Sequence, residues 1–156
     1  MMEEKIVVPL DGSKVGESAL PYVQGLVSKL LPNLKVEVIL LQVLKMAPPV
    51  ATYGASDISL NNYTEKQMEE NKKNAEDYLN KIGETLRSKG AEITARVVIG
   101  NTAEEIVKVA EEMNANLIAM STHGRSGLSR WAFGSVTDKV LKLEGRIPIT
   151  MVKAQK

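Results

Sequence analysis

The stretch LIAMSTHGRSGLSRWAFGSVTDK, residues 117–139, begins as a short apolar run, continues as a loop and reaches a helix start at Gly134 and Ser135. Strand, loop and helix in this order form the unit from which parallel sheets are built. The first turn of such a helix leaves backbone N–H groups without intrahelical partners and carries partial positive charge. A glycine before that turn lets an anion approach the backbone closely. The stretch therefore predicts a parallel sheet and an anion site.

Gly134 and Ser135 also have a plainer interpretation. Serine and glycine commonly begin helices, and Asp138, three residues after Ser135, resembles the second member of a capping box. Under this interpretation the segment is a helix start that binds no ligand.

The same alternation of strand and helix extends over the rest of the chain. Strands are predicted from apolar, β-branched runs of the kind that a parallel sheet buries on both faces, and helices from apolar residues at helical spacing. The predicted strands are residues 5–10, 34–44, 91–99, 117–120 and 147–152, and the predicted helices are residues 15–31, 63–89, 102–113 and 135–143. This pattern predicts an α/β fold: an open, doubly wound, five-stranded parallel sheet with helices on both faces, Rossmann-like, in a single domain over residues 1–156.

Three local features add detail to this pattern. Pro21 falls inside the first predicted helix, so the first turn of that helix is expected to be irregular. Thr102, with Glu105 three residues later, predicts a capping box. Residues 45–62 have no periodicity and predict a long flexible loop, which we interpret as a lid, as a flap that contacts a partner, or as a plain flexible excursion.

The ends of two strands point to a binding crevice. In an open α/β sheet, ligands bind beyond the carboxyl ends of the strands, where the strand order reverses. Asp11 follows the first predicted strand and Ser121 follows the fourth. If those two strands are adjacent, both loops border one crevice.

Composition excludes several classes of function. The formal net charge is +1, so no broad basic field is available to hold a nucleic-acid backbone. The chain has no cysteine and one histidine, which excludes disulfides, thiol catalysis and a histidine cluster for zinc. No apolar run approaches the roughly 18 residues of a membrane helix, and the N-terminus does not resemble a signal peptide. We therefore expect a cytoplasmic protein without nucleic-acid or membrane partners.

Well-known motifs for other sites are absent from the sequence. The first strand is followed by Asp11-Gly12-Ser13 rather than by G-x-G-x-x-G, and there is no Walker P-loop. A phospho-accepting receiver domain would need an acidic cluster after the first strand and an aspartate after the third, where Gly100-Asn101 stands. The nucleophile elbow G-x-S-x-G is also missing.

Several side chains of the 123–133 loop have two interpretations each. His123, the only histidine, is able to donate to a phosphate or to act in acid–base chemistry, but such a residue also packs or caps a loop. Arg125 and Arg130 are candidate phosphate donors or solvated loop arginines. Trp131 and Phe133 are interpreted as anchors of the loop or as an interface patch.

At four strand–loop junctions the chain resembles the universal stress protein family. The ATP-binding branch of that family carries the motif G-x2-G-x9-G-[S/T]. Here the spacing is kept as Ser121-x2-Gly124-x9-Gly134-Ser135, with serine in place of the first glycine. The other matching segments are residues 9–13, 41–43 and 98–100. The resemblance covers essentially the full length and implies an adenine nucleotide alpha hydrolase-like fold.

The resemblance also implies the residues that hold a nucleotide. The adenine would lie against Pro9, Leu10 and Asp11 and the backbone near Val43. The ribose would lie against Gly100 and the turn from Met120 through Ser121 and His123 to Gly124. The phosphates would bind Gly124, Gly134, Ser135, Val136 and Thr137, near the separate candidate donor Arg125. The implied ligand is ATP, with Mg²⁺ as an accompanying ion, and Ser121 adds a side chain where the family motif has none.

Three functions are compatible with this sequence. The first is a nucleotide-dependent regulator or sensor of the stress response with unknown protein partners. The second is a slow ATP hydrolase or phosphotransferase that uses Mg²⁺, although Asp11 is the only acid that the strand ends place at the crevice. The third is a dimerisation module that binds no nucleotide. The resemblance further implies a homodimer built through the last strand, residues 147–152.

Overall fold

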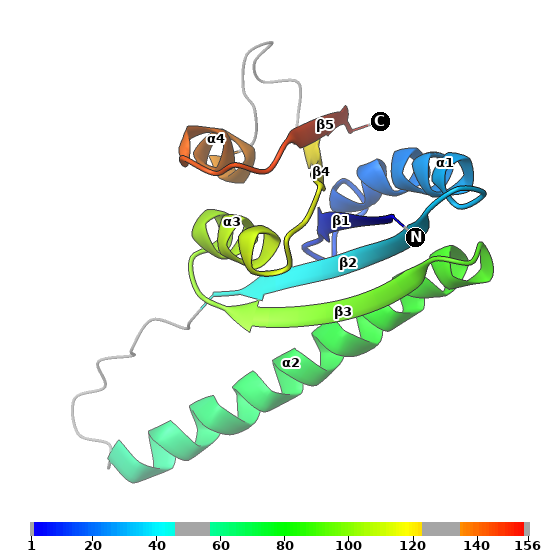
Figure 1. The fold of residues 1–156 in the computed structure, drawn as a ribbon. Coiled ribbons are helices and arrows are strands. Elements are labelled where there is room, and N and C mark those ends of the chain that lie inside the picture. The colour runs from blue at the N-terminus through cyan, green and yellow to red at the C-terminus, as the bar shows by residue number, and fades with distance from the viewer. Residues whose placement is uncertain (1, 46–56, 123–134, 155–156) are drawn as a thin grey trace.

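The computed structural model describes residues 2–45, 57–122 and 135–154, with the backbone alone described for residues 57–64. One sheet of five parallel strands lies at its centre, in the order β3-β2-β1-β4-β5 (Figure 1). The strands are β1 (Glu3–Pro9), β2 (Lys35–Leu44), β3 (Glu92–Ile99), β4 (Leu117–Thr122) and β5 (Ile149–Lys153). This arrangement confirms the predicted five-stranded α/β class.

The strand order reverses beside β1. Ile6 pairs with Val38 of β2 on one side and with Leu117 of β4 on the other. From β1 the chain winds outward through β2 and β3, then crosses back to β4 and β5 on the opposite side. The adjacency of the first and fourth strands is therefore confirmed, and it places the carboxyl ends of β1 and β4 at the switch point where α/β proteins bind ligands.

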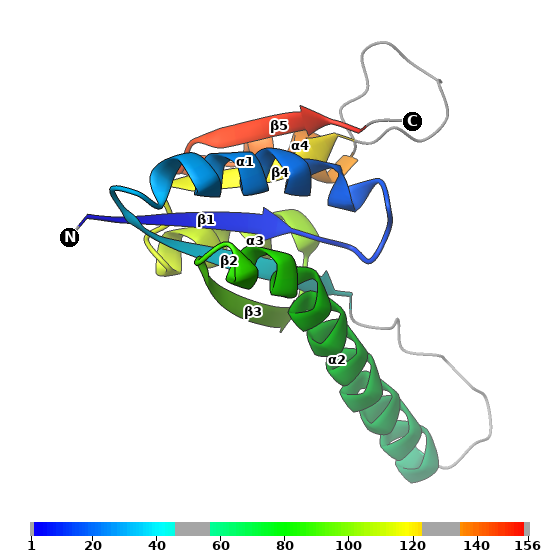
Figure 2. The ribbon, with the colours of Figure 1, turned by 90° about the vertical axis from the view of Figure 1, so that its right-hand side faces the viewer.

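Helices cover both faces of the sheet. They are the 3₁₀ helix η1 (Gly16–Ala19) and the α-helices α1 (Leu20–Leu30), α2 (Asp57–Ser88), α3 (Thr102–Glu112) and α4 (Ser135–Lys142). Figures 1 and 2 show α1 and α2 on one face and α3 and α4 on the other.

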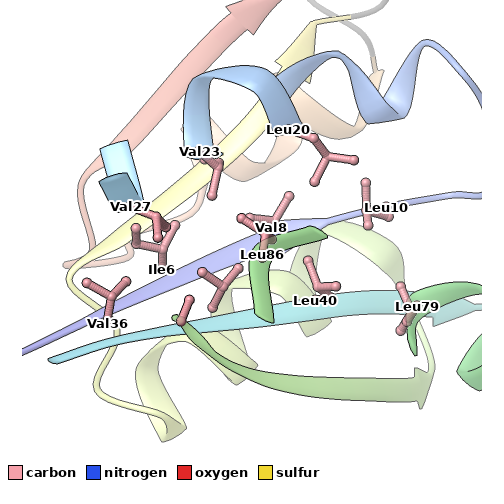
Figure 3. Packing of buried hydrophobic residues seen from close by; sticks show 13 residues of the cluster. Ile6, Val8, Leu10, Leu20, Val23, Val27, Val36, Leu40, Leu79 and Leu86 are labelled. Atoms are coloured by element: carbon pink, nitrogen blue, oxygen red, sulfur yellow. The ribbon is translucent and has the colours of Figure 1, made fainter. Parts of the chain in front are cut away.

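Two apolar layers join the helices to the sheet. Figure 3 shows the first, a buried cluster that includes Val23 of α1, Leu79 of α2 and Val8 of β1. The second layer packs Ile106 of α3 and Val140 of α4 against Val7 and its neighbours. Each fully buried aliphatic side chain contributes about 1.5–3 kcal/mol, whereas an exposed ion pair contributes about 0–1 kcal/mol. Packing of these layers, rather than surface charge, holds the strand ends in place.

The first predicted helix is split in the structure. Residues 16–19 form η1, and α1 begins at Leu20 with Pro21 in its first turn. A proline there costs no intrahelical hydrogen bond, since the N–H groups of the first turn have no helical acceptor. The expected irregular start of this helix is confirmed.

The second helix begins earlier than predicted. The structure has α2 from Asp57, so residues 57–62 of the predicted 45–62 loop are helical, and residues 46–56 lie outside the described residues. Between Asp57 and Ser88 the chain contains no proline and a single glycine, Gly83. No residue in this interval therefore forces the backbone out of the helix, although Ser and Asn at its start are weak helix formers.

The capping box predicted at Thr102 and Glu105 is wrong. Asn101 is the N-cap of α3 and makes no side-chain capping bond, and Thr102 is already helical. A hydroxyl caps a helix only from the N-cap position, so this shift of one residue removes the predicted bond. The backbone N–H of Glu105 instead donates to the Asn101 carbonyl at 2.9 Å.

The last strand begins later than predicted, since β5 covers Ile149–Lys153 instead of residues 147–152. Pro148 has no N–H for a ladder. Its carbonyl nevertheless accepts a 2.9 Å hydrogen bond from the Ile118 N–H, so Pro148 is bonded to β4 immediately before β5 begins.

Candidate functional site

A cavity of about 380 Å³ lies beyond the carboxyl ends of β1, β2 and β4. This volume falls within the range of roughly 300–1,000 Å³ that is typical of small-molecule sites. The strand ends form one side of the cavity, and the starts of η1, α3 and α4 border the rest. Its lining residues are Pro9, Leu10, Asp11, Val15, Gly16, Val43, Lys45, Thr102, Ile106, Met120, Ser121, Ser135, Val136 and Thr137.

The cavity brings together most of the candidate residues that the structure describes. Nine of them line it: Pro9, Leu10, Asp11, Val43, Met120, Ser121, Ser135, Val136 and Thr137. Gly100 does not, because it follows β3, which is separated from β1 by β2. A side chain at Gly100 would meet the Glu105 side chain at 2.9 Å, so this glycine accommodates a neighbouring residue of α3. His123, Gly124, Arg125 and Gly134 lie outside the described residues.

Five lining residues were not singled out from the sequence as site residues. They are Val15, Gly16, Lys45, Thr102 and Ile106. Gly16 carried a signal, because a glycine shortly after the first strand lets the backbone approach a neighbouring group closely. The others gave no distinctive signal, since a lysine after a strand and a threonine or isoleucine in a helix are common.

The loop after β1 is fixed by short hydrogen bonds around Asp11. Its Oδ1 accepts from the Ser13 N–H at 2.9 Å and from the Ser13 hydroxyl at 2.5 Å. The Ser13 Oγ in turn accepts from the Gly16 N–H at 3.0 Å. Gly12 has a φ of +84°, a conformation that glycine adopts without the penalty of a side chain. This sequence of turn residues holds the Asp11 carboxylate beside the cavity.

Close approach explains the glycine at position 16. A Cβ built on Gly16 would lie 2.5 Å from Asp11 Oδ1 and 3.2 Å from Ser13 Oγ. No side chain fits at that separation, so only glycine lets η1 begin directly over the Asp11 carboxylate.

Ser121, which replaces the first glycine of the family motif, turns its hydroxyl toward η1. Its Oγ donates to the Gly16 carbonyl at 2.9 Å and accepts from the Ala19 N–H at 2.9 Å. The extra side chain is therefore accommodated by two hydrogen bonds to the turn that follows Asp11.

Two helix starts border the cavity, and they differ in charge. The first turn of α3 carries Glu104 and Glu105, which oppose an anion there. The first turn of α4 carries only Asp138, and the carboxylate of Asp138 is paired with Lys142 at 2.7 Å. The start of α4, where Ser135 lies, is therefore the better of the two for a phosphate.

Opposite charges flank the cavity at the two central strand ends. Among the described residues that line it, Asp11 is the one carboxylate and Lys45 is the one cation. Asp11 follows β1 and Lys45 follows β2, and these two strands lie side by side in the sheet. The described lining is otherwise apolar or hydroxyl-bearing.

The profile of the universal stress protein family matches residues 2–153 of the chain. This chain belongs to that family. The match covers nearly the whole sequence, and nine of the ten described candidate residues line the cavity. Within the described residues, no helix is long and apolar enough to cross a membrane.

Relatives of this universal stress protein extend the comparison. It is 32% identical to universal stress protein MJ0577 of Methanocaldococcus jannaschii over 165 residues, which covers 98% of this chain and 96% of the relative. A solved structure of MJ0577 matches with a TM-score of 0.77 and 28% identity, over 100% of this chain and 99% of the other. This similarity supports the assignment to the ATP-binding branch of the family.

Two more distant structures share the fold. One is a universal stress protein in complex with cAMP, with a TM-score of 0.56 and 18% identity over 99% of this chain and all of the other. The other is a family member from Arabidopsis thaliana with AMP bound, with a TM-score of 0.62 and 14% identity over 97% and 92% of the two chains. At these identities the likeness concerns the fold alone.

Proposed function

We propose that this universal stress protein is a cytoplasmic regulator or sensor that binds an adenine nucleotide, with ATP as the first candidate. Family membership supports a role in the stress response. In this proposal the bound nucleotide changes the contacts that the protein makes with partner proteins. The observation that carries it is the cavity at the β1–β4 switch point, lined by nine of the residues that the family motifs assign to the nucleotide.

The chemistry of the cavity agrees with an adenine nucleotide lying across it. At one end, Leu10, Val43 and Met120 offer apolar surface for a flat base, and Asp11 offers a carboxylate. At the other end, Ser135 and Thr137 lie in the first turn of α4, where backbone N–H groups favour phosphate. The relatives with bound cAMP and AMP indicate that this fold is able to hold such a ligand.

The proposal includes Mg²⁺ as an ion that binds together with the nucleotide. In the described part of the chain, no group of three or more histidine, aspartate or glutamate side chains is arranged to hold a metal ion. Mg²⁺ commonly keeps several waters and binds through phosphate oxygens and one or two carboxylates. Asp11 is the described carboxylate at the cavity, so any Mg²⁺ would depend mainly on the phosphates.

The proposal is tested on purified, heat-denatured protein. The released supernatant is assayed for adenine nucleotides, and the folded protein is titrated with ATP, with and without Mg²⁺, while its melting temperature is recorded. We expect released nucleotide or an upward shift in melting temperature, because a ligand that binds only the folded state stabilises it. Absence of both results overturns the proposal. Steady ADP production would instead favour the slow hydrolase.

We also propose that the protein forms a homodimer through β5. This strand is an edge of the sheet, and Ile149, Thr150, Met151 and Val152 are only partly buried. An exposed apolar edge is open to pairing with another strand, and a two-fold dimer would cover it. Light scattering after size exclusion should give twice the monomer mass, and Thr150→Lys should shift it to monomer. A wild-type monomer at micromolar concentration overturns this part.

A further inference from the structure

Ser121 joins two walls of the cavity through its hydroxyl. The residue lies in β4, where its backbone pairs with Val152 of β5. Its Oγ bonds to Gly16 and Ala19, which are 105 and 102 positions away in the chain. Ala19 is fully buried. A buried backbone N–H is costly to leave without an acceptor, so the Ser121 hydroxyl stabilises the η1 turn.

The two bonds continue into the loop that carries Asp11. Ser121 binds the carbonyl of Gly16, the N–H of Gly16 donates to the Ser13 hydroxyl, and that hydroxyl donates to Asp11. The side chains and backbone of four residues thus form one continuous chain of hydrogen bonds. It leads from the end of β4 to the Asp11 carboxylate at the base end of the cavity.

The hydrogen bonds of Ser121 also fix the position of η1 relative to Asp11, which follows β1. Gly16 lies so close to Asp11 that a Cβ would come within 2.5 Å of its Oδ1. Any shift of η1 away from β4 therefore changes the position available to the Asp11 carboxylate. Because Asp11, Gly16 and Ser121 all line the cavity, such a shift changes the shape of the site itself.

We propose that Ser121 is a positioning residue for the nucleotide: its hydroxyl holds η1, and through Gly16 and Ser13 the Asp11 carboxylate, against the end of β4. This inference rests on the proposed function. It differs from the family motif, which has glycine at this position. Glycine offers no hydroxyl, so restoring the motif with Ser121→Gly weakens nucleotide binding in this chain.

The test compares four variants by calorimetric titration with ATP and GTP at a temperature where all are folded. Ser121→Gly and Ser121→Ala should weaken ATP binding about tenfold, as expected for the loss of one or two partly buried hydrogen bonds. They should also change the ratio of ATP to GTP affinity, because Asp11 lies at the base end, adenine and guanine offer different donors to its carboxylate, and η1 no longer has the hydrogen bonds of Ser121. Ser121→Thr keeps the hydroxyl and should restore wild-type values.

Ser28→Ala is the matched control, since the Ser28 hydroxyl also bonds to a backbone carbonyl, that of Gln24 at 3.0 Å, but is exposed on α1. It should leave both affinities unchanged. A Ser121→Ala protein with wild-type affinity and selectivity overturns the proposal, even if its melting temperature falls, because a purely structural role lowers stability alone.

Hydrogen exchange distinguishes a failure of the positioning role of Ser121 from a failure of the proposed nucleotide binding. In Ser121→Ala without nucleotide, the Ala19 amide should exchange about tenfold faster, because it loses its acceptor. If the wild type binds no adenine nucleotide, the proposed function and the positioning role both fall, and faster Ala19 exchange would then show only that Ser121 holds the turn. Unchanged Ala19 exchange, with nucleotide binding intact, contradicts the hydrogen-bond chain directly.

Discussion

The hydroxyl of Tyr78 in α2 donates a hydrogen bond of 3.0 Å to Oε1 of Glu17 in η1. Burial raises the pKa of Tyr78 well above its usual value, and the Glu17 carboxylate raises it further as hydrogen-bond acceptor and as charge, with a smaller contribution from Asp11. The η1 turn is thus bonded to α2 as well as to β4, so two separate elements hold the turn that borders the cavity.

The shifted pKa of Tyr78 predicts a loss of stability in alkaline solution. An unfolded tyrosine has a pKa of about 10, and the folded protein holds the Tyr78 proton to higher pH. The contribution of Tyr78 is therefore fully present below about pH 10, and it declines as the pH rises toward the folded-state pKa. Urea unfolding between about pH 8 and pH 11 should show a steeper decline for the wild type than for Tyr78→Phe. Equal slopes would contradict the assigned shift.

Gly16→Ala should weaken nucleotide binding by about tenfold or more, because the new Cβ would lie 2.5 Å from Asp11 Oδ1 and must displace that carboxylate. The measurement is the Kd for ATP. Gly25→Ala serves as the control, since a Cβ on Gly25 meets no atom within 4 Å. ATP affinity that survives Gly16→Ala would mean that the Asp11 position is irrelevant to the ligand.

Glycine-to-alanine substitutions in two helices should change the free energy of unfolding in opposite directions. At Gly83 in α2, a Cβ would come 2.8 Å from Ile93 Cγ2 and 3.4 Å from Leu40 Cδ1, so the helix must move away from the sheet. Overpacking of this kind costs about 1–3 kcal/mol. At Gly25 in α1 the space is open, and alanine should stabilise the helix by roughly 0.5–1 kcal/mol. Chemical denaturation measures both, and two changes of the same sign would refute the packing argument.

The fold was largely predictable because its determinants are local. Runs such as residues 5–10 are apolar enough to be buried on both faces, and each is followed by a helical pattern, which leaves few topologies for the sheet. Element ends were less predictable. The start of α2 at Asp57 follows residues with weak and mixed propensities. Asn101, not Thr102, is the N-cap of α3, because Asn101 is extended while Thr102 is already helical.

The site was predictable where strand ends and the family motif place residues, as for Asp11 and Val43. It was not predictable where long-range bonds decide the outcome. The two bonds of the Ser121 hydroxyl join residues more than 100 positions apart, so sequence spacing alone marks the serine only as a departure from glycine. Lys45 and Thr102 line the cavity for the same reason, because the sheet brings the ends of separate elements together.

Ser135→Ala should weaken binding of the phosphates without changing binding of the adenosine part of the nucleotide. Ser135 is the first residue of α4 and is exposed beside the cavity, so losing its hydroxyl costs little packing. If phosphates bind there, affinity for ATP should fall about three- to tenfold, the range of one charge-assisted hydrogen bond, while affinity for adenosine stays unchanged. Ser88→Ala, which removes an exposed hydroxyl at the end of α2, should alter neither.

The comparison is made by titrating the wild type and Ser135→Ala with adenosine, AMP, ADP and ATP. The first ligand of this series that binds Ser135→Ala more weakly than the wild type identifies the phosphate that lies at the start of α4. An equal loss for adenosine and ATP would place the effect on the base end or the fold, and no loss for any ligand would remove the phosphates from the start of α4.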